Sequence, residues 1–206
     1  MRKKNFLNHV LQNTSYPQGF WGRMILRGMN YFHASLANRG MKQVEWKPGW
    51  NVLDIGCGGG ANLKRLLNLC PRGNIYGIDL SEESVAFAKR YNARYLDKRC
   101  FIQQGNVCSL PYENEFFDVA TAFETVYFWS PVKTALAEVA RVLKKGGCFL
   151  ISLEASGPKA GEMWTKRITG MVVYTADDLK RLLTEAGFSS VETIHRKNEL
   201  HIITHK

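Results

Sequence analysis

Residues 52–60 read Val-Leu-Asp-Ile-Gly-Cys-Gly-Gly-Gly, a short apolar run that ends in an acid and is followed by a glycine-rich turn. Leucines at helical spacing come next, in residues 61–67. This order predicts a buried parallel strand, a tight turn and the first turn of a helix. Glycines permit positive φ angles and carry no Cβ that would keep a ligand away from the backbone. Because the N–H groups of a first helical turn attract anions, we expect a small, partly anionic ligand at this turn.

Length and composition are those of an ordinary globular chain. The 206 residues suggest one domain with a sizeable core. No apolar run approaches the roughly 18 to 20 residues of a membrane-spanning helix, and the basic N-terminus lacks the apolar core of a signal peptide. Five scattered cysteines contain no CxxC pair, which favours reduced thiols and a cytoplasmic location. We predict a single domain over 1–206, with a helical cover at 1–45 and a core at 46–206.

The formal net charge of +10 raises the question of an acidic partner. A nucleic-acid surface would gather its basic residues beside aromatic ones. Here the basic residues are spread over nearly every predicted helix, and those at 89–99 lie toward the end of one helix, where they suit its dipole. The charge therefore favours a solvated surface, with an acidic partner or nucleic acid as the alternative.

Strand and helix signals alternate along the core. The predicted strands are 50–55, 74–79, 100–104, 117–123, 148–153, 188–195 and 199–204. The last two are separated by Lys197-Asn198 and can form an antiparallel hairpin. Alternating βα units give a parallel sheet with helices on both faces. We therefore predict the α/β class: a Rossmann-like, doubly wound sheet of seven strands, mostly parallel, with a C-terminal antiparallel hairpin and an N-terminal helical cover.

Several helices have recognisable starts. Ser81 is predicted as an N-cap, and Pro131 as the first residue of a helix. Thr175 and Asp178 have the spacing of a capping box. The helix expected over 20–39 is apolar on more than one face, so part of it should cover a neighbouring surface or a ligand.

Asp79 ends the predicted strand 74–79, a little over twenty residues beyond Gly56. An acid at this position can accept two hydrogen bonds from ribose hydroxyls. Charge-assisted bonds of this kind contribute roughly 1.5–3 kcal/mol each. A helix-cap or turn aspartate is the alternative interpretation. Because the glycine turn and the acid occur together at the required spacing, a ligand with a ribose is favoured.

Two ligands fit the turn and the acid. Gly56, Gly58 and Ala61 satisfy the G-x-G-x-x-G/A pattern of dinucleotide-binding folds. Asp54 argues against a dinucleotide, because a carboxylate two residues before the first glycine would repel a pyrophosphate. The same carboxylate is well placed for an ammonium group. A molecule with an ammonium, a carboxylate and a ribose is described by S-adenosylmethionine.

Several segments resemble the motifs of one family. They are residues 52–60, 78–81, 105–107, 110–111, 116–119 and 141–147. On these motifs the chain resembles class I S-adenosylmethionine-dependent methyltransferases, of the group that includes ubiquinone/menaquinone-type and other small-molecule enzymes. The similarity runs from about 48 to 154 and extends to the C-terminal hairpin. The first motif is specific when it is combined with Asp79.

The resemblance implies which residues contact the cofactor. Asp54 and Gly56–Gly58 would face the methionine moiety, Asp79 the ribose, and Leu80 the adenine. The full implied set is Asp54, Gly56, Cys57, Gly58, Asn62, Asp79, Leu80, Gly105, Asn106, Val107 and Glu124. Asn106 departs from the commoner Asp: a carboxylate only accepts hydrogen bonds from the adenine amino group, whereas an amide accepts or donates. We expect binding to survive this change with a somewhat altered affinity.

The motifs specify no catalytic residue. The reaction needs alignment of nucleophile and methyl group, which can supply roughly 7–11 kcal/mol, and a base only where the acceptor is protonated and weakly acidic. The candidate bases are Glu124, Tyr127, Tyr16 and His33. For each of them alone, a packing or surface role is the simpler interpretation. His201 and His205 could share a strand face but lack an evident third ligand, so no metal site is predicted.

The acceptor is less well specified. Residues 123–127 lack the Asn/Asp-Pro-Pro-aromatic motif of amino-methylating nucleic-acid enzymes and the Pro-Cys of cytosine-C5 enzymes. Large apolar side chains could instead line a pocket, with core packing as the alternative. These are Phe20, Trp21, Met24, Tyr127, Phe128, Trp129 and Trp164. We predict methyl transfer to a small, apolar or aromatic acceptor, with residues 1–45 and 154–173 closing over the site. The alternatives are an NAD(P)-dependent oxidoreductase and a non-catalytic S-adenosylmethionine-binding protein.

Overall fold

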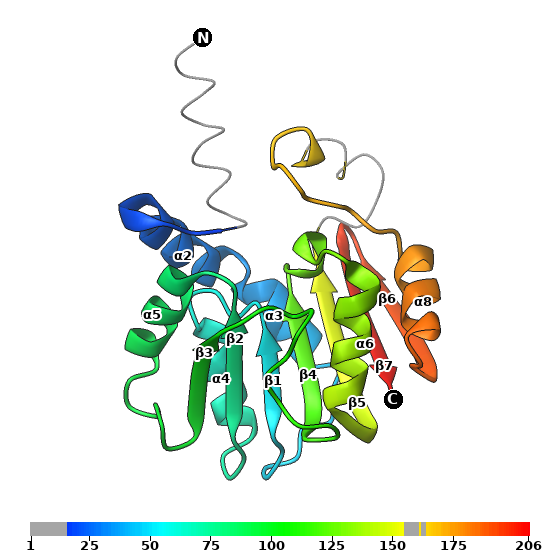
Figure 1. The fold of residues 1–206 in the computed structure, drawn as a ribbon, viewed down its shortest axis with the longest axis horizontal. Helices are drawn as coiled ribbons and strands as arrows, with labels where there is room; N and C mark the ends of the chain where they lie inside the picture. The colour runs from blue at the N-terminus through cyan, green and yellow to red at the C-terminus, as the bar shows by residue number, and fades with distance from the viewer. Residues whose placement is uncertain (1–15, 155–160, 162–163) are drawn as a thin grey trace.

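The computed structural model describes residues 16–154, 161 and 164–206, and a sheet of seven strands forms its centre (Figure 1). In chain order the strands are β1 (Val52–Ile55), β2 (Ile75–Asp79), β3 (Cys100–Gln104), β4 (Phe117–Phe123), β5 (Leu143–Leu153), β6 (Ser190–Arg196) and β7 (Glu199–His205). In space they run β3-β2-β1-β4-β5-β7-β6. Strands β1 to β5 pair in parallel, and β7 pairs antiparallel with β5 and β6. The predicted fold class is confirmed, and the order reverses between β1 and β4, where such sheets bind ligands.

Helices cover both faces of this sheet. Helices α3 (Ala34–Met41), α4 (Ala61–Leu69) and α5 (Glu82–Tyr91) pack on one face, while α6 (Val132–Val142) and α8 (Ala176–Glu185) pack on the other. Helix α2 (Gly19–Phe32) is different, since it lies beyond one end of the strands and contacts α3 and α5 (Figure 1). It therefore stands at the edge of the sheet where the parallel strands end.

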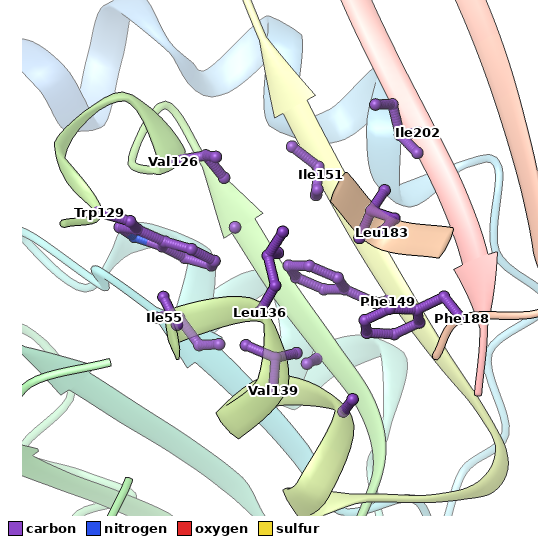
Figure 2. Packing of buried hydrophobic residues seen from close by; sticks show 14 of the residues in the cluster. Ile55, Val126, Trp129, Leu136, Val139, Phe149, Ile151, Leu183, Phe188 and Ile202 are labelled. Atoms are coloured by element: carbon purple, nitrogen blue, oxygen red, sulfur yellow. The ribbon is translucent and has the colours of Figure 1, made fainter. Parts of the chain in front are cut away.

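The larger core cluster lies between the sheet and α6 and α8 (Figure 2). The indole of Trp129 stacks on the ring of Phe149, with 6.2 Å between centroids and 7° between planes. Phe188 packs on the other side of Phe149, at 5.8 Å. The remaining labelled side chains are Ile55, Val126, Leu136, Val139, Ile151, Leu183 and Ile202. This cluster fixes β4 and β5 against α6, and so fixes the loop that leaves the end of β4.

The strand predictions are confirmed with shifted ends. Strands β3 and β4 have the predicted bounds, while β1 begins at Val52 rather than Trp50. Strand β5 begins at Leu143 rather than Cys148, because Leu143 pairs with Phe117 across a register shift. The glycines before Cys148 are also held by the C-terminus, since Gly146 N donates to Lys206 O at 2.9 Å. Pairing with residues far away in sequence therefore extends the strand beyond its predicted start.

Two helix predictions need correction. The single helix expected over 20–39 divides at His33, whose φ of −87° and ψ of 2° end α2 and start α3 in a new direction. Pro131 is the N-cap of α6 rather than its first helical residue. The N-cap at Ser81 is confirmed, because its hydroxyl accepts a bond from Ser84 N.

No helix within the described residues 16–154, 161 and 164–206 is long and apolar enough to cross a membrane.

The capping box of α8 provides a test of this local structure. The Thr175 hydroxyl accepts a bond from Asp178 N, and the Asp178 carboxylate accepts one from Thr175 N. We expect Thr175→Ala to lower the free energy of unfolding by about 1 kcal/mol, because an orphan N–H of the first turn loses its acceptor. Urea denaturation followed by circular dichroism would measure the change. Thr184→Ala, on the same helix, should stay within about 0.5 kcal/mol of the wild type, and an equal loss in both variants would contradict the assignment.

Candidate functional site

The glycine turn after β1 is fastened to the end of β2. The backbone N–H groups of Gly56 and Cys57 both donate to Ile78 O, at 2.8 and 3.1 Å. Gly56 has a φ of +74°, and a Cβ there would collide with the side chain of Thr125. Gly60 has a φ of +76° and forms the N-cap of α4. The turn therefore needs glycine at both positions, for its backbone conformation and, at Gly56, for the close approach of the β4 loop.

Asp79 completes this attachment. Its Oδ2 accepts a hydrogen bond from Gly58 N at 2.9 Å, and its Oδ1 accepts one from Ser81 N at 2.9 Å. Burial raises the pKa of the Asp79 carboxyl, while these two N–H donors oppose the shift. A carboxylate has about four lone-pair positions, so two bonds from the protein leave acceptor capacity for a ligand. The acid predicted to bind a ribose thus also supports the turn.

A cavity opens beside this carboxylate, at the carboxyl ends of β1, β2 and β4. Together with the open solvent at its mouth, it encloses about 860 Å³. Leu26 and Met29 of α2 form one wall, and Phe128 and Trp129 form another. The predicted cofactor residues that line it are Gly56, Gly58, Asp79, Leu80, Gly105, Asn106, Val107 and Glu124. The structure therefore brings together most of the set that the resemblance implies.

A smaller hollow lies across the glycine turn. Cys57 and Asn62, the next two predicted residues, line it together with Asn30 and His33. Met29, Gly56, Gly58 and Glu124 line both spaces. The two hollows therefore lie side by side along the turn.

Asp54 lies behind the glycine turn. It is 1% exposed and lines neither hollow. Its Oδ1 accepts a bond from the Thr121 hydroxyl at 2.8 Å, while its Oδ2 is buried with no hydrogen-bond partner among the described residues. Burial raises the pKa of Asp54 to about 7. The alternation of side chains along β1 explains this, because Ile55 takes the cavity side and Asp54 the face covered by α4.

Residues 16–41 cover the site through specific contacts. The Asn30 amide donates to Gly59 O at 3.1 Å, and the Ser81 hydroxyl donates to Pro17 O at 2.8 Å. Arg23 forms an ion pair with Glu83 of α5 at 3.3 Å. The cover is therefore attached to the same two segments that Asp79 joins, the glycine turn and the start of α5.

Glu124 follows β4 in an unusual environment for an acid. Its φ is +61°, a left-handed conformation that is costly for a residue other than glycine. Its Oε1 accepts bonds from the Tyr127 hydroxyl, at 3.1 Å, and from Glu154 N. Burial, with a further contribution from the negative charge of Glu154, raises the pKa of Glu124 to about 8. His33 Nδ1 lies 3.7 Å from Glu124 Oε2, too far for a hydrogen bond.

The four candidate bases are not equivalent. Glu124 and His33 line the hollows, and burial lowers the pKa of His33 although Glu154 opposes this shift. Tyr127 is 2% exposed and reaches the site through its bond to Glu124. Tyr16 is 40% exposed and lines neither hollow. The structure therefore concentrates the acid–base groups around Glu124.

One set of potential metal ligands occurs among the described residues. Atoms of His33, Glu124 and Glu154 lie within 4.8 Å of one another. His201 and His205 do not form a site: His201 is buried against the Ser152 hydroxyl at 2.9 Å, whereas His205 is exposed at the end of β7. Sequence spacing missed the first set because its three members directly follow α2, β4 and β5, which are far apart in the chain.

The predicted apolar pocket is only partly correct. Phe128 and Trp129 line the cavity, but Trp21 and Met24 are each 47% exposed and lie outside it. Leu26 and Met29 take their place. Because the sequence of α2 is apolar on both sides, periodicity alone could not decide which side faces the cavity. Trp164 packs against the larger core cluster.

Comparison with known proteins supports the resemblance seen in the motifs. Residues 53–151 match the model of a family described as a methyltransferase domain. This match agrees with the class I S-adenosylmethionine-dependent methyltransferases that the sequence resembles. The chain is 30% identical over 169 residues to an O-methyltransferase of Pyrenophora dematioidea, covering 79% of this chain and 63% of the relative. It is 35% identical over 118 residues to the demethylmenaquinone methyltransferase of Symbiobacterium thermophilum, covering 56% of this chain and 47% of the relative.

The fold of this chain is shared with solved structures. A crystal structure of an S-adenosylmethionine-dependent methyltransferase from Aquifex aeolicus superposes with a TM-score of 0.74 at 20% identity, covering 88% of this chain and 96% of that one. The chain spans about two-thirds and about half of the length of the two curated relatives. The comparisons therefore support the resemblance and show the fold.

The buried acid at the site gives a pH-dependent prediction. Because the pKa of Glu124 is raised in the folded state, its contribution to stability is complete below its ordinary value near 4.5 and is lost as the pH rises through about 8. From about pH 5 to about pH 9, the free energy of unfolding of the wild type should therefore fall relative to Glu124→Gln, by about 3 kcal/mol. Urea denaturation of both proteins over this range would measure the difference. Glu113→Gln, the same change at an exposed position, should follow the wild type, and parallel curves for Glu124→Gln would contradict the assignment.

Proposed function

We propose that this chain transfers a methyl group from S-adenosylmethionine to a small-molecule acceptor in the cavity between α2 and the ends of β1, β2 and β4. The observation that carries the proposal is the Asp79 carboxylate, held at the glycine turn with acceptor capacity to spare on the cavity side. The family, whose donor is S-adenosylmethionine, supports the same conclusion. The division into a cover at 1–45 and a core at 46–206 is part of this proposal.

The residues around the cavity fit this cofactor. Asp79 would accept bonds from the ribose, and Leu80, which is 53% exposed, offers an apolar surface for adenine. Gly105, Asn106 and Val107 would line the adenine edge. The Oδ1 of Asn106 already accepts a bond from Cys108 N at 2.9 Å, so its amide group would act toward adenine as a donor. This differs from an Asp at the same position, which has no donor.

The methionine end would lie along the glycine turn. Gly56, Cys57, Gly58 and Asn62 line the hollows there. Glu124 is the acid that lines both hollows, so its negative charge lies near the methionine end of the cofactor. The carboxylate of Asp54 would attract the ammonium group from behind the glycine turn, without touching it.

When bound, the sulfonium supplies a methyl group that is already activated. The protein must then align the acceptor with that methyl and exclude water, tasks that the walls of the cavity perform. Leu26, Met29, Phe128 and Trp129 make these walls apolar, which supports an apolar or aromatic acceptor. The acceptor named for the demethylmenaquinone relative is of this kind.

For an acceptor that carries a proton, we propose Glu124 as the base. Its raised pKa of about 8 gives its carboxylate more basicity than an ordinary glutamate has. The Tyr127 hydroxyl and Glu154 N hold one oxygen, which leaves Oε2 for the acceptor. His33 would be a positioning residue, and Tyr16 has no role in this scheme.

Two further parts of the proposal concern the setting of the reaction. All five cysteines are free thiols, which supports a cytoplasmic location. Nucleic acid is not proposed as the acceptor, because residues 123–127 lack the motif of enzymes that methylate base amino groups.

Asp79 provides the direct test of cofactor binding. We expect Asp79→Asn to weaken the binding of S-adenosylmethionine and S-adenosylhomocysteine at least about tenfold, since it removes a charged acceptor worth roughly 1.5–3 kcal/mol. Isothermal titration calorimetry would measure both affinities. Asp97→Asn, at an exposed acid in the turn before β3, is the control and should bind as the wild type does. Unchanged affinity in Asp79→Asn would contradict the ribose assignment.

The reaction itself is tested separately. Wild-type protein incubated with S-adenosylmethionine and a panel of apolar phenols, quinols and amines should release S-adenosylhomocysteine with at least one acceptor. Binding of NAD without binding of S-adenosylmethionine would favour an oxidoreductase. Binding of the sulfonium compound with no transfer to any acceptor would favour a binding protein.

A further inference from the structure

Helix α2 carries a second apolar stripe on the side away from the cavity. Tyr31 and Phe32 are 78% and 73% exposed, and Trp21 and Met24 are each 47% exposed. With 3.6 residues per turn, these four side chains fall within one arc of the helix, about 100° wide. Leu26 lies outside that arc and is fully buried. The inner apolar side of α2 is therefore buried, whereas the rings of Tyr31 and Phe32 on the other side are mostly exposed.

The exposure of Tyr31 and Phe32 is costly in water. Their rings stack edge to face with centroids 5.5 Å apart, so they present one continuous aromatic surface. Large exposed aromatic pairs on a monomer mark an interaction site more often than they serve the fold. The pair lies at the C-terminal end of α2, immediately before the break at His33.

Cations border the stripe along the groove between α2 and α5. Arg27 and Tyr31 line the groove from α2, and Phe87, Arg90 and Tyr91 line it from α5. Arg27 has no hydrogen bond or ion pair to any described residue. The side chain of Arg90 is 63% exposed, and its guanidinium lies 6.0 Å from the centroid of the Phe87 ring.

One acid faces the same groove. Glu83 of α5 lies 3.3 Å from Arg23 and 3.9 Å from Arg90, so it offsets part of their charge. The balance stays positive, in keeping with the formal charge of +10 for the chain. The sequence adds Arg2, Lys3 and Lys4 upstream of α2.

Aromatic rings beside arginines are the composition of a helix that lies on a lipid surface. Tyr, Trp and Phe are stable at the boundary between head groups and acyl chains, and arginines reach the phosphates there. An anionic leaflet attracts each added cation near it. A second copy of the chain fits this face less well, because an isologous contact would bring two sets of these arginines together.

We propose that the outer side of α2, with the groove against α5, docks this protein on an anionic lipid surface. The occupant is the surface itself, with the rings of Tyr31 and Phe32 in the head-group region and Arg27 and Arg90 near the phosphates. The inner side of the same helix lines the cavity, so docking would place the cavity wall at the membrane, where apolar acceptors dissolve. This link to the acceptor rests on the proposed function, whereas the docking does not.

Vesicle flotation without cofactor tests the docking. We expect the wild type to bind vesicles containing about one-third phosphatidylglycerol at least about tenfold more tightly than pure phosphatidylcholine vesicles, and to lose most of this binding at high salt. Equal binding to both vesicle types, or no binding to either, would overturn the proposal. Because the assay contains no S-adenosylmethionine, its result does not depend on whether the proposed methyl transfer is correct.

Matched variants locate the surface. We expect Arg27→Glu to weaken binding to the anionic vesicles about tenfold or more, and the double change Tyr31→Ser and Phe32→Ser to do the same. The controls are Lys145→Glu and Leu69→Ser, the same kinds of change at exposed positions elsewhere, and each should retain wild-type binding. Circular dichroism should give one spectrum for all five proteins, which shows that the variants are folded. Equal losses in variants and controls, or a dimer by light scattering that only the α2 variants abolish, would refute docking on lipid.

Discussion

The site depends on the position of one carboxylate, that of Asp79. By accepting from Gly58 N and Ser81 N, it joins the glycine turn to the start of α5. The turn is fixed a second time when Gly56 N and Cys57 N donate to Ile78 O. With three of its backbone N–H groups, those of Gly56, Cys57 and Gly58, bonded to the end of β2, the turn has little freedom to move. A ligand therefore meets a preformed surface, and its binding free energy is not spent on ordering the loop.

The N-terminal cover continues this arrangement outward. Asn30 is bonded to Gly59 O, and Pro17 O accepts from Ser81, so α2 is attached to both segments that Asp79 connects. The helix consequently has a fixed inner side, which carries Leu26 and Met29 into the cavity. Its outer side carries aromatic residues that the fold does not need. Helix α2 thus lies between the cavity on its inner side and the proposed lipid surface on its outer side.

Two buried acids give the site its electrostatic character. Burial raises the pKa of Asp54 to about 7 and that of Glu124 to about 8, so both acids beside the glycine turn stay protonated to a higher pH than ordinary carboxyl groups do. A cation nearby favours the ionised form of each. The proposed cofactor carries positive charge on both its sulfonium and its ammonium, and its arrival would relieve this cost. The same acids would repel an anionic pyrophosphate.

Local signals in the sequence determined most of the fold. The apolar run before the glycines, the acid at 79, the Ser81 and Thr175 caps and the alternation of strands and helices each depend on residues close together in the chain. Their spacing also supplied the ligand chemistry, because the turn and Asp79 come from adjacent βα units. The expected bounds were less accurate at β5, where Leu143 pairs with Phe117 and Gly146 with the C-terminus.

The sequence by itself therefore determined the fold class, the glycine turn and the acid beside it. Only the tertiary structure decided that Asp54 faces Thr121 and away from the cavity, and that Leu26 lines the cavity while Trp21 does not. It alone gathered His33, Glu124 and Glu154 from three separate elements. The physical reason is the range of the interactions. Turns, caps and periodicity depend on residues a few positions apart in the chain. Which side chains of a buried strand, or of a helix that is apolar on two sides, face the cavity depends on distant residues that pack against that element.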